Sequence, residues 1–412
     1  MSDKPTDKRL ADLSDRMRRE WDERIQHDYR FWMSDGVADD AAMWQTGVRD
    51  FAILSRGIDA LSAKNQVALE VGCGVGRLVR AAAGVFERVI GVDVSGDGLN
   101  RAREFLRGLP NVEFIQSNGF DLQPVPERSV DFAYSFAALS SMPIAVAASY
   151  ICDLARVLKP GGIARLQIYL GHEQGTCEID SIAIRSFERE RFESAVSAAG
   201  FRVEWIEELK LPFDISDAAA GLVAHIAGLV RETSVPRSAA DVSLLLAQSE
   251  ERPEGRHGER EWVGSRTAYL MAVYRAQQHL EAGRADEARK ALVFAIENYA
   301  DAEEDVKAHL RDLQQLCGIP TGGIATTASS VPANSIADVA TPLGSGFSSE
   351  FYEKNLRALR DRFPAVAKQL ERITQLPDLT VEHGSSGLPV LRFRGNTLDH
   401  RDKPDRSGSA WA

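Results

Sequence analysis

The spacing of hydrophobic positions divides the first half of the chain into two kinds of segment. Residues 8–32 carry an apolar stripe, Leu10, Leu13, Met17, Trp21 and Ile25, with spacings of three and four that predict an amphipathic helix. A second helix is expected over Asp39–Leu61. From Gln66 onward, short apolar runs alternate with helical patterns. The expected strands are Val67–Gly72, Arg88–Asp93, Val112–Gln116, Val130–Ser135, Ile163–Tyr169 and Phe201–Ile206. This alternation indicates an α/β fold with a mostly parallel sheet and right-handed crossovers.

The pattern after residue 212 is helical and less regular. Ala218–Val230 looks helical, and helices over 267–280 and 285–299 are expected on either side of Gly283. A third helix is expected over 303–316. Residues 320–346 are rich in Gly, Ala, Ser, Thr and Pro, which is typical of a flexible linker.

Composition and charge exclude several classes of protein. The chain has 412 residues, of which 44% are hydrophobic and 26% charged, as expected for a globular protein. The net charge of −11 disfavours nucleic acid and an anionic membrane surface as partners. The longest apolar run falls short of the roughly 20 residues that span a bilayer, so no membrane insertion is expected. Four scattered cysteines without metal-ligand spacing indicate reduced thiols, a cytoplasmic location and no metal site.

A glycine-rich turn after the first expected strand is the strongest chemical signal. Leu69-Glu-Val-Gly-Cys-Gly-Val-Gly-Arg77 permits a tight turn and close approach of backbone N–H groups to a ligand. Its G-x-G-x-G spacing differs from the G-x-G-x-x-G dinucleotide fingerprint, which disfavours a nicotinamide oxidoreductase. Asp93 ends the second strand, about 20 residues further on, where a doubly wound fold carries its ribose-binding acid.

These blocks resemble class I S-adenosylmethionine-dependent methyltransferases over about Leu61–Leu209. Three further stretches agree in order: Ser117–Leu122, Asp131–Phe136 and Arg156–Gly162. The resemblance implies a Rossmann-like, doubly wound, mostly parallel sheet, with S-adenosyl-L-methionine as cofactor. It also implies an antiparallel strand after Phe201–Ile206. Because Ala218–Val230 looks helical instead, the sheet is expected either to be completed later or to lack one strand.

The resemblance also implies which residues hold the cofactor. They are Glu70, Gly72, Cys73, Gly74, Gly76, Arg77, Asp93, Val94, Asn118, Gly119, Phe120 and Ser135. Glu70 should face the methionyl amino group, Asp93 the ribose hydroxyls and Val94 the adenine. Asn118 occupies the place of an acid that accepts from the adenine amino group, and its amide oxygen can still accept. Ser135 lies where the fourth strand opens toward the methyl group, and Cys73 is interpreted as a small buried filler.

A narrower resemblance concerns the methyl acceptor. Trp21–Arg24, Met43–Gly47 and Tyr134–Phe136 are similar to stretches in bacterial methyltransferases found with polysaccharide and glycan assembly enzymes. It implies a sugar or glycan precursor, of a surface polysaccharide or a flagellin glycan, as substrate. Those proteins often carry Phe-Gln-His-Ile-Pro after the fourth strand, where this chain has Leu-Ser-Ser-Met-Pro with Ser141 in the histidine position. Either that histidine is dispensable, or the chemistry has changed or been lost.

Two histidines are considered as the general base that would assist a hydroxyl or amine acceptor. His172 follows the fifth major strand, and its alternative interpretation is an ordinary loop histidine. His27, beside Asp28 on the N-terminal helix, could reach the site if that helix acts as a lid. Its alternative is a solvated helix face. Tyr134 is interpreted as a wall of the cofactor pocket.

The C-terminal part offers a possible protein partner site. Gly283–Ala288 with Ala276 and Ala295 resembles one tetratricopeptide-like hairpin, or is a simple helical hairpin packed on the domain. Phe351–Pro364 looks like the opening helix of motility accessory proteins linked to flagellin glycosylation. The tail is then a remnant or a docking element. The alternative is an amphipathic helix with a disordered end.

Five units and two functional hypotheses follow. The units are 1–60, an N-terminal helical lid; 61–212, the S-adenosylmethionine-binding domain; 213–318, an all-α region; 319–346, a linker; and 347–412, a helix with a mostly disordered tail. The first hypothesis is a methyltransferase acting on a hydroxyl or amine of a small molecule. The second is a weak or inactive cofactor-binding scaffold that acts through its helical hairpin and tail.

Overall fold

The computed structural model describes the α/β part of the chain almost completely and the C-terminal part in short pieces. The described residues are 5–34, 37, 39–59, 63–171, 180–209, 223–232, 237–247, 271–272, 275–276, 278–279, 284–298, 379–383 and 389–393. The predictions for His172, for a helix over 303–316, for the linker 319–346 and for a helix in 351–364 lie outside these residues.

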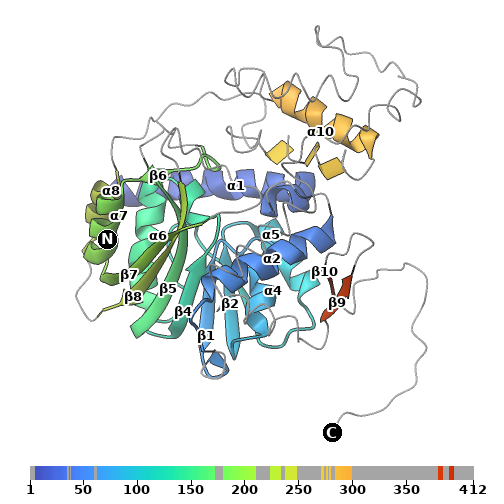
Figure 1. Ribbon diagram of the computed structural model, residues 1–412. Coiled ribbons are helices and arrows are strands. Elements are labelled where there is room, and N and C mark those ends of the chain that lie inside the picture. The colour runs from blue at the N-terminus through green and yellow to red at the C-terminus, as the bar shows by residue number, and fades with distance from the viewer. Residues whose placement is uncertain are drawn as a thin grey trace.

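An eight-stranded sheet forms the centre of the molecule (Figure 1). Its strands are β1 (Val67–Val71), β2 (Arg88–Asp93), β3 (Val112–Gln116), β4 (Val130–Ser135), β5 (Leu158–Leu170), β6 (Ser186–Phe187), β7 (Phe201–Glu208) and β8 (Val223–Arg231). The order is β3-β2-β1-β4-β5-β8-β7, and β6 pairs with the end of β5. Strands β1 to β5 pair in parallel, whereas β8 is antiparallel to both its neighbours. The predicted α/β fold with a mostly parallel sheet is confirmed.

The helical interpretation of Ala218–Val230 is wrong from Val223 on, because β8 is the antiparallel strand of the sheet. It lies between β5 and β7 and pairs with both. Residues 226–229 of β8 are buried in succession, so both of its faces are covered here. Such a strand has a continuous apolar sequence, which periodicity cannot tell from a buried helix. Gly228 allows close packing here, since a Cβ on it would lie 2.5 Å from Cε2 of Trp205. The sheet therefore extends to Arg231, past residue 212.

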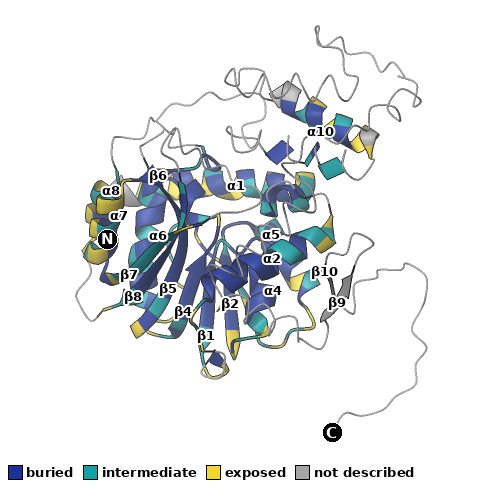
Figure 2. Ribbon diagram, in the orientation of Figure 1, coloured by how far each residue is buried: buried dark blue, intermediate teal, exposed yellow. Residues whose placement is uncertain are grey.

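Two layers of helices cover the sheet. The first contains α2 (Asp40–Leu54), α4 (Arg77–Ala83) and α5 (Gly96–Phe105); the second contains α6 (Ile144–Val157), α7 (Arg189–Ala198) and α8 (Ala239–Leu246). Each layer closes its own hydrophobic cluster against one face of the sheet. Figure 2 shows the strands as largely buried, with exposed positions gathered on the outer sides of α7 and α8. Among the described residues, none of the helices is long and apolar enough to cross a membrane.

Helix α1 (Pro5–Met33) runs across one end of the sheet (Figure 1). Its apolar stripe packs there as predicted: Leu13 and Met17 join the first cluster, and Ile25 joins the second. The helix is interrupted at Asp28, whose backbone is extended at φ −167° and ψ 97°. It therefore consists of a long segment before Asp28 and a short turn of helix after it.

After residue 280 the structure describes the helix α10 (Ala285–Asn298) and two strands. Strands β9 (Leu379–His383) and β10 (Pro389–Phe393) form an antiparallel pair. They lie within 347–412, for which the sequence pattern predicts a helix with a mostly disordered tail and no strand. The sequence of β9 does alternate apolar and polar residues, which is the signal of a strand.

Candidate functional site

A cavity lies at the carboxyl ends of β1 and β2, with α1 on its other side. Its empty volume is about 840 Å³, the part open to solvent included, which is within the range of small-molecule sites. The strand side contributes Glu70, Gly72, Cys73, Gly74, Arg77 and Asp93. Val94 follows directly on β2 and lines the cavity as well. The cavity is therefore at the edge of the sheet where α/β proteins bind ligands.

The glycine loop is the tight turn that its spacing predicts. Gly72, Gly74 and Gly76 all have positive φ, at +75°, +51° and +83°. Backbone N–H groups of Gly72 and Cys73 both donate to the carbonyl of Val92, at 2.8 and 3.1 Å. Because L-residues with side chains rarely adopt such φ values, glycine is required for the chain to turn back here between β1 and α4.

Asp93 joins the glycine loop to the start of α5. Its Oδ2 accepts from the Gly74 N–H at 2.7 Å, and its Oδ1 accepts from the Ser95 N–H at 2.8 Å. The cap of α5 is Ser95, whose Oγ accepts from Gly98 N–H at 2.9 Å. Burial raises the pKa of Asp93. Each carboxylate oxygen still has a lone pair for a further donor, such as a ribose hydroxyl.

Glu70 is a buried carboxyl group at the cavity wall. It is 2% exposed, and its Oε2 has no hydrogen-bond partner. Burial raises its pKa to about 8, although the nearby charge of Arg77 acts in the opposite direction. Tyr134 is fully buried and does not line the cavity, so the structure does not make it the predicted pocket wall. A buried carboxyl oxygen without a hydrogen-bond partner is a site for a cationic or N–H donor.

Arg77 lines the cavity, but its charge is already paired. Its Nη1 donates to Thr46 Oγ1 at 3.0 Å and to the Asp50 carboxylate, both on α2. Asp50 is fully buried and also accepts from Arg49 Nε at 2.7 Å. Gly47 brings α2 close to this pair, because a Cβ there would lie 2.4 Å from the carbonyl oxygen of Arg77. Arg77 thus fixes α2 against the start of α4.

The structure does not bring four of the predicted cofactor residues to the cavity. Asn118 uses its Oδ1 to accept from the N–H groups of Phe120 and Asp121, at 3.1 and 3.0 Å. Ser14 of α1 donates to the Asn118 carbonyl, and a Cβ on Gly119 would lie 1.9 Å from Ser14 Oγ. Helix α1 therefore covers the turn of Asn118, Gly119 and Phe120. Ser135 is fully buried and donates to the Val71 carbonyl at 3.0 Å.

Of the two predicted bases, His27 lies within the described residues, and it does not line the cavity. His27 is exposed, stacks on Phe294 with ring centroids 5.0 Å apart, and accepts from Trp32 Nε1 at 3.2 Å. Ser141 does line the cavity, and its Oγ donates to the Ala138 carbonyl at 2.9 Å. Cys73 lines it too, with a pKa raised well above the usual value by burial, which disfavours a reactive thiolate. Within the described ranges, no cluster of His, Cys, Asp or Glu could hold a metal.

The opposite wall of the cavity comes from α1. It consists of Met17, Trp21, Ile25, Trp32 and Met33, which meet Phe136 and Met142 from the segment after β4. The sequence predicts the stripe of Met17, Trp21 and Ile25 and a lid formed by its helix, but it does not indicate that these side chains line the cavity. Trp32 and Met33 lie beyond the stripe, and no pattern in the sequence indicates that they line the cavity.

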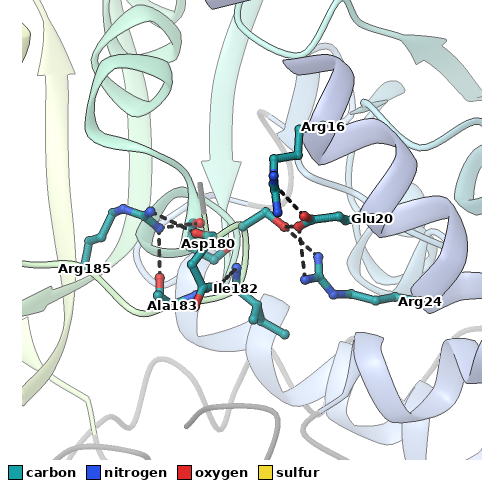
Figure 3. Close-up of polar contacts among 9 residues, drawn as sticks. Arg16, Glu20, Arg24, Asp180, Ile182, Ala183 and Arg185 are labelled. Carbon is teal, nitrogen blue, oxygen red and sulfur yellow. Dashed lines mark hydrogen bonds and ion pairs between the residues drawn. The ribbon is translucent and has the colours of Figure 1, made fainter. Parts of the chain in front are cut away.

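A buried polar cluster holds α1 in place (Figure 3). Glu20 pairs with Arg16 Nε at 2.7 Å and with Arg24 Nη2 at 3.5 Å, and it also accepts from Ser181 Oγ. Arg24 is 0% exposed and donates to Ser181 Oγ at 2.8 Å. Its guanidinium lies 4.6 Å from the ring centroid of Trp21. Burial raises the pKa of Glu20. Ser181, in the segment between β5 and β6, therefore anchors the part of α1 that carries the aromatic wall.

Arg185 ties the same segment to the other side of the cavity. It is nearly fully buried and donates to the carbonyls of Ser141, Ala183 and Asp180, at 2.8, 3.0 and 2.9 Å. Figure 3 shows its guanidinium turned toward Asp180 and Ala183. The segment that holds Glu20 and Arg24 thus also fixes Ser141 in the cavity wall.

Comparison with known proteins identifies the domain. Residues 69–166 match the family described as "Methyltransferase domain". A demethylmenaquinone methyltransferase of Tropheryma whipplei is 36% identical over 94 residues, 23% of this chain and 38% of that protein. An uncharacterized methyltransferase of Synechocystis sp. is 35% identical over 101 residues, 24% of this chain and 46% of that protein. The chain thus spans less than half the length of these curated relatives.

Solved methyltransferases resemble the chain more distantly. Geranyl diphosphate C-methyltransferase from Streptomyces coelicolor is 15% identical, with a TM-score of 0.38 over 45% of this chain and 79% of that chain. From the family match and the curated relatives, the chain carries a methyltransferase domain of the class I S-adenosylmethionine-dependent type. S-adenosylmethionine is the cofactor of that domain.

Proposed function

We propose that the chain is an S-adenosylmethionine-dependent methyltransferase that methylates a hydroxyl or amine of a small molecule. The observation that carries the proposal is Glu70, whose buried Oε2 has no partner at the cavity wall. The methionyl ammonium of the cofactor would supply the missing donor. Asp93 faces the same cavity and would accept from the ribose hydroxyls. The glycine loop between them lets the ligand approach the backbone closely.

The chain's own contribution to methyl transfer would be positioning. When bound, the cofactor supplies a methyl group already activated on a sulfonium. Glu70 and Asp93 would fix two parts of the cofactor, and the aromatic wall of α1 would keep water away from it. Holding two reactants in line supplies much of the catalysis in such a displacement. A role of α1 as a lid, and of His172 as the base, remain predictions.

The acceptor that we propose is a sugar or glycan precursor, following the narrower resemblance of the sequence. Trp21 and Trp32 on the cavity wall support this proposal. An indole ring offers a large flat apolar face, and a sugar ring has apolar faces that can pack against it. A cytoplasmic location of the protein is part of the same proposal.

A second candidate is a cofactor-binding scaffold without turnover. Ser141 favours it, because this residue stands where the similar glycan-related methyltransferases carry a histidine. Its hydroxyl donates to the Ala138 carbonyl, so it is not directed at a base. Such a scaffold would act on a protein partner through the C-terminal helices and the tail.

Methyl transfer from labelled S-adenosylmethionine to nucleotide sugars and extracted glycan separates the two candidates. We expect label in the sugar fraction with the wild type and none with an Asp93→Ala variant. Cofactor binding by the wild type without transfer to any of these acceptors would contradict the sugar proposal and favour the scaffold.

A further inference from the structure

The break in α1 at Asp28 separates the long part of the helix from a short segment that reaches the cavity. Asp28 has an extended backbone, and its Oδ1 accepts from the Arg30 N–H at 3.0 Å. This is the geometry of an N-cap, so Asp28 begins a new turn of helix. Trp32 and Met33 at the end of that turn both line the cavity.

Arg275, far away in the sequence, binds both ends of this segment. Its Nη1 donates to Asp28 Oδ2, and its Nη2 donates to the carbonyl of Val37. Its guanidinium also lies 4.8 Å from the ring centroid of Phe31. Only 12% of the Arg275 side chain is exposed. One guanidinium therefore bridges the start and the end of the segment that carries Trp32 and Met33.

Helix α10 adds a second contact on the same segment. The Phe294 ring stacks on His27 and meets Phe31 edge-on, with centroids 5.0 and 6.1 Å apart. The C-terminal helical residues thus hold the break on both sides, His27 before it and Phe31 after it. This packing joins α10 to the α/β part of the chain.

The segment held by Arg275 rests directly on the glycine loop. A Cβ on Gly74 would lie 2.2 Å from Met33 Sδ, which shows how closely Met33 covers this glycine. The Gly74 N–H is the donor to Asp93 Oδ2. A displacement of Met33 would therefore change the space above the loop that binds the cofactor.

We propose that Arg275 is a positioning residue of the cofactor cavity: it clamps Asp28 and Val37, and thereby fixes the Trp32–Met33 wall over the glycine loop. The C-terminal helices are then part of the methyltransferase site. The effect on the cavity wall stands on the contacts alone, whereas the effect on cofactor affinity rests on the proposed function.

Hydrogen–deuterium exchange of the full chain, combined with S-adenosylhomocysteine titration, tests the clamp. In Arg275→Ala we expect amide exchange of residues 29–37 to become at least tenfold faster, and the dissociation constant to rise at least fivefold. Arg275→Lys should recover only part of either change, because an ammonium lacks the planar fork that reaches two acceptors. Asp28→Asn keeps an oxygen for the Arg30 N–H but loses the charge that faces Arg275. Its exchange rate and its dissociation constant should therefore each rise only twofold to threefold.

Arg56→Ala is the matched control. Arg56 also pairs with a carboxylate, Glu207, at 2.5 and 2.6 Å, and lies over an aromatic ring, Trp205, at 4.6 Å. None of these three residues lines the cavity. Its removal should leave both the exchange of residues 29–37 and the affinity within twofold of wild type.

Three outcomes would overturn the clamp. The first is a folded Arg275→Ala protein with wild-type exchange and affinity. The second is an Arg56→Ala protein that loses as much affinity as Arg275→Ala. The third concerns the case in which Arg275→Ala does not fold: an Asp28→Asn protein with wild-type exchange and affinity would then contradict the clamp. A wild type that does not bind S-adenosylhomocysteine would contradict the proposed function, while the exchange data would still decide whether Arg275 fixes the wall.

Discussion

The two walls of the cavity are built in different ways. On the strand wall, Asp93 is held by backbone N–H groups of Gly74 and Ser95 from two neighbouring βα turns. On the α1 wall, the aromatic side chains depend on ion pairs and hydrogen bonds between distant parts of the chain. Arg24 and Ser181 are 157 residues apart, and Arg275 and Asp28 are 247 residues apart.

The two walls should therefore differ in how well they tolerate substitution. A group fixed by local backbone geometry keeps its position as long as the turn forms. A group fixed by buried charges depends on every partner being present, since a buried charge that loses its counter-ion is strongly destabilising. Removal of a single side chain from the α1 wall should therefore mainly lower the stability of the fold. Substitutions on the strand wall should mainly weaken ligand binding.

The largest expected effect comes from Glu20→Ala, which removes the acid of the buried cluster that holds α1 in place. It leaves Arg24, which is 0% exposed, without its carboxylate. We expect the free energy of unfolding to fall by about 3–5 kcal/mol, measured by urea denaturation. Glu23→Ala on the exposed side of the same helix is the control and should change it by less than about 0.5 kcal/mol. Equal small effects of both would contradict a wall held by buried charge.

The next effect is a pH dependence from the strand wall. The pKa of Glu70 is raised from 4.5 to about 8, so the folded chain holds this proton more tightly than the unfolded chain. The free energy of unfolding should therefore fall as pH rises between these two values, by on the order of a few kcal/mol. Glu70→Gln should flatten that part of the profile in urea denaturation at a series of pH values.

Cofactor binding should reverse the protonation of Glu70. An ammonium beside the carboxyl group favours its charged form, so binding near pH 7 should release a proton. Calorimetric titration in buffers of different ionisation enthalpy measures this release, and Glu70→Gln should abolish it. A wild type that releases no proton would contradict the proposed partner of Glu70.

The smallest effect is expected from Ser135→Ala. Its hydroxyl donates to the Val71 carbonyl inside the sheet, away from the cavity. Removing this bond should lower the free energy of unfolding by about 1 kcal/mol and leave the affinity for S-adenosylhomocysteine unchanged. Clearly weaker binding by this variant would mean that Ser135 reaches the cofactor, as the family resemblance implies.

The strand wall could be predicted from the sequence because its signals are local. A glycine spacing and an acid at a strand end fix Gly72, Gly74 and Asp93 within two adjacent turns. The α1 wall could not, because no local pattern pairs Arg24 with Ser181 or Arg275 with Asp28. The same limit explains β8: its apolar run fits a helix or a buried strand, and only its pairing with β5 and β7 decides. The Asn118 side chain accepts from backbone N–H groups of its own turn instead of facing the cavity, and the sequence does not indicate this.

Calorimetric titration of the full chain with S-adenosylhomocysteine, beside Asp93→Ala, decides whether this cavity holds the cofactor. The wild type should bind, and the variant should bind about 100-fold more weakly, a loss of about 2.7 kcal/mol. The variant loses the proposed acceptor for the ribose and leaves the N–H groups of Gly74 and Ser95 without their carboxylate. Glu104→Ala, an exposed acid on α5, is the control and should bind as wild type. A folded wild type that does not bind, or equal binding by Asp93→Ala, would contradict the assignment of this cavity to the cofactor.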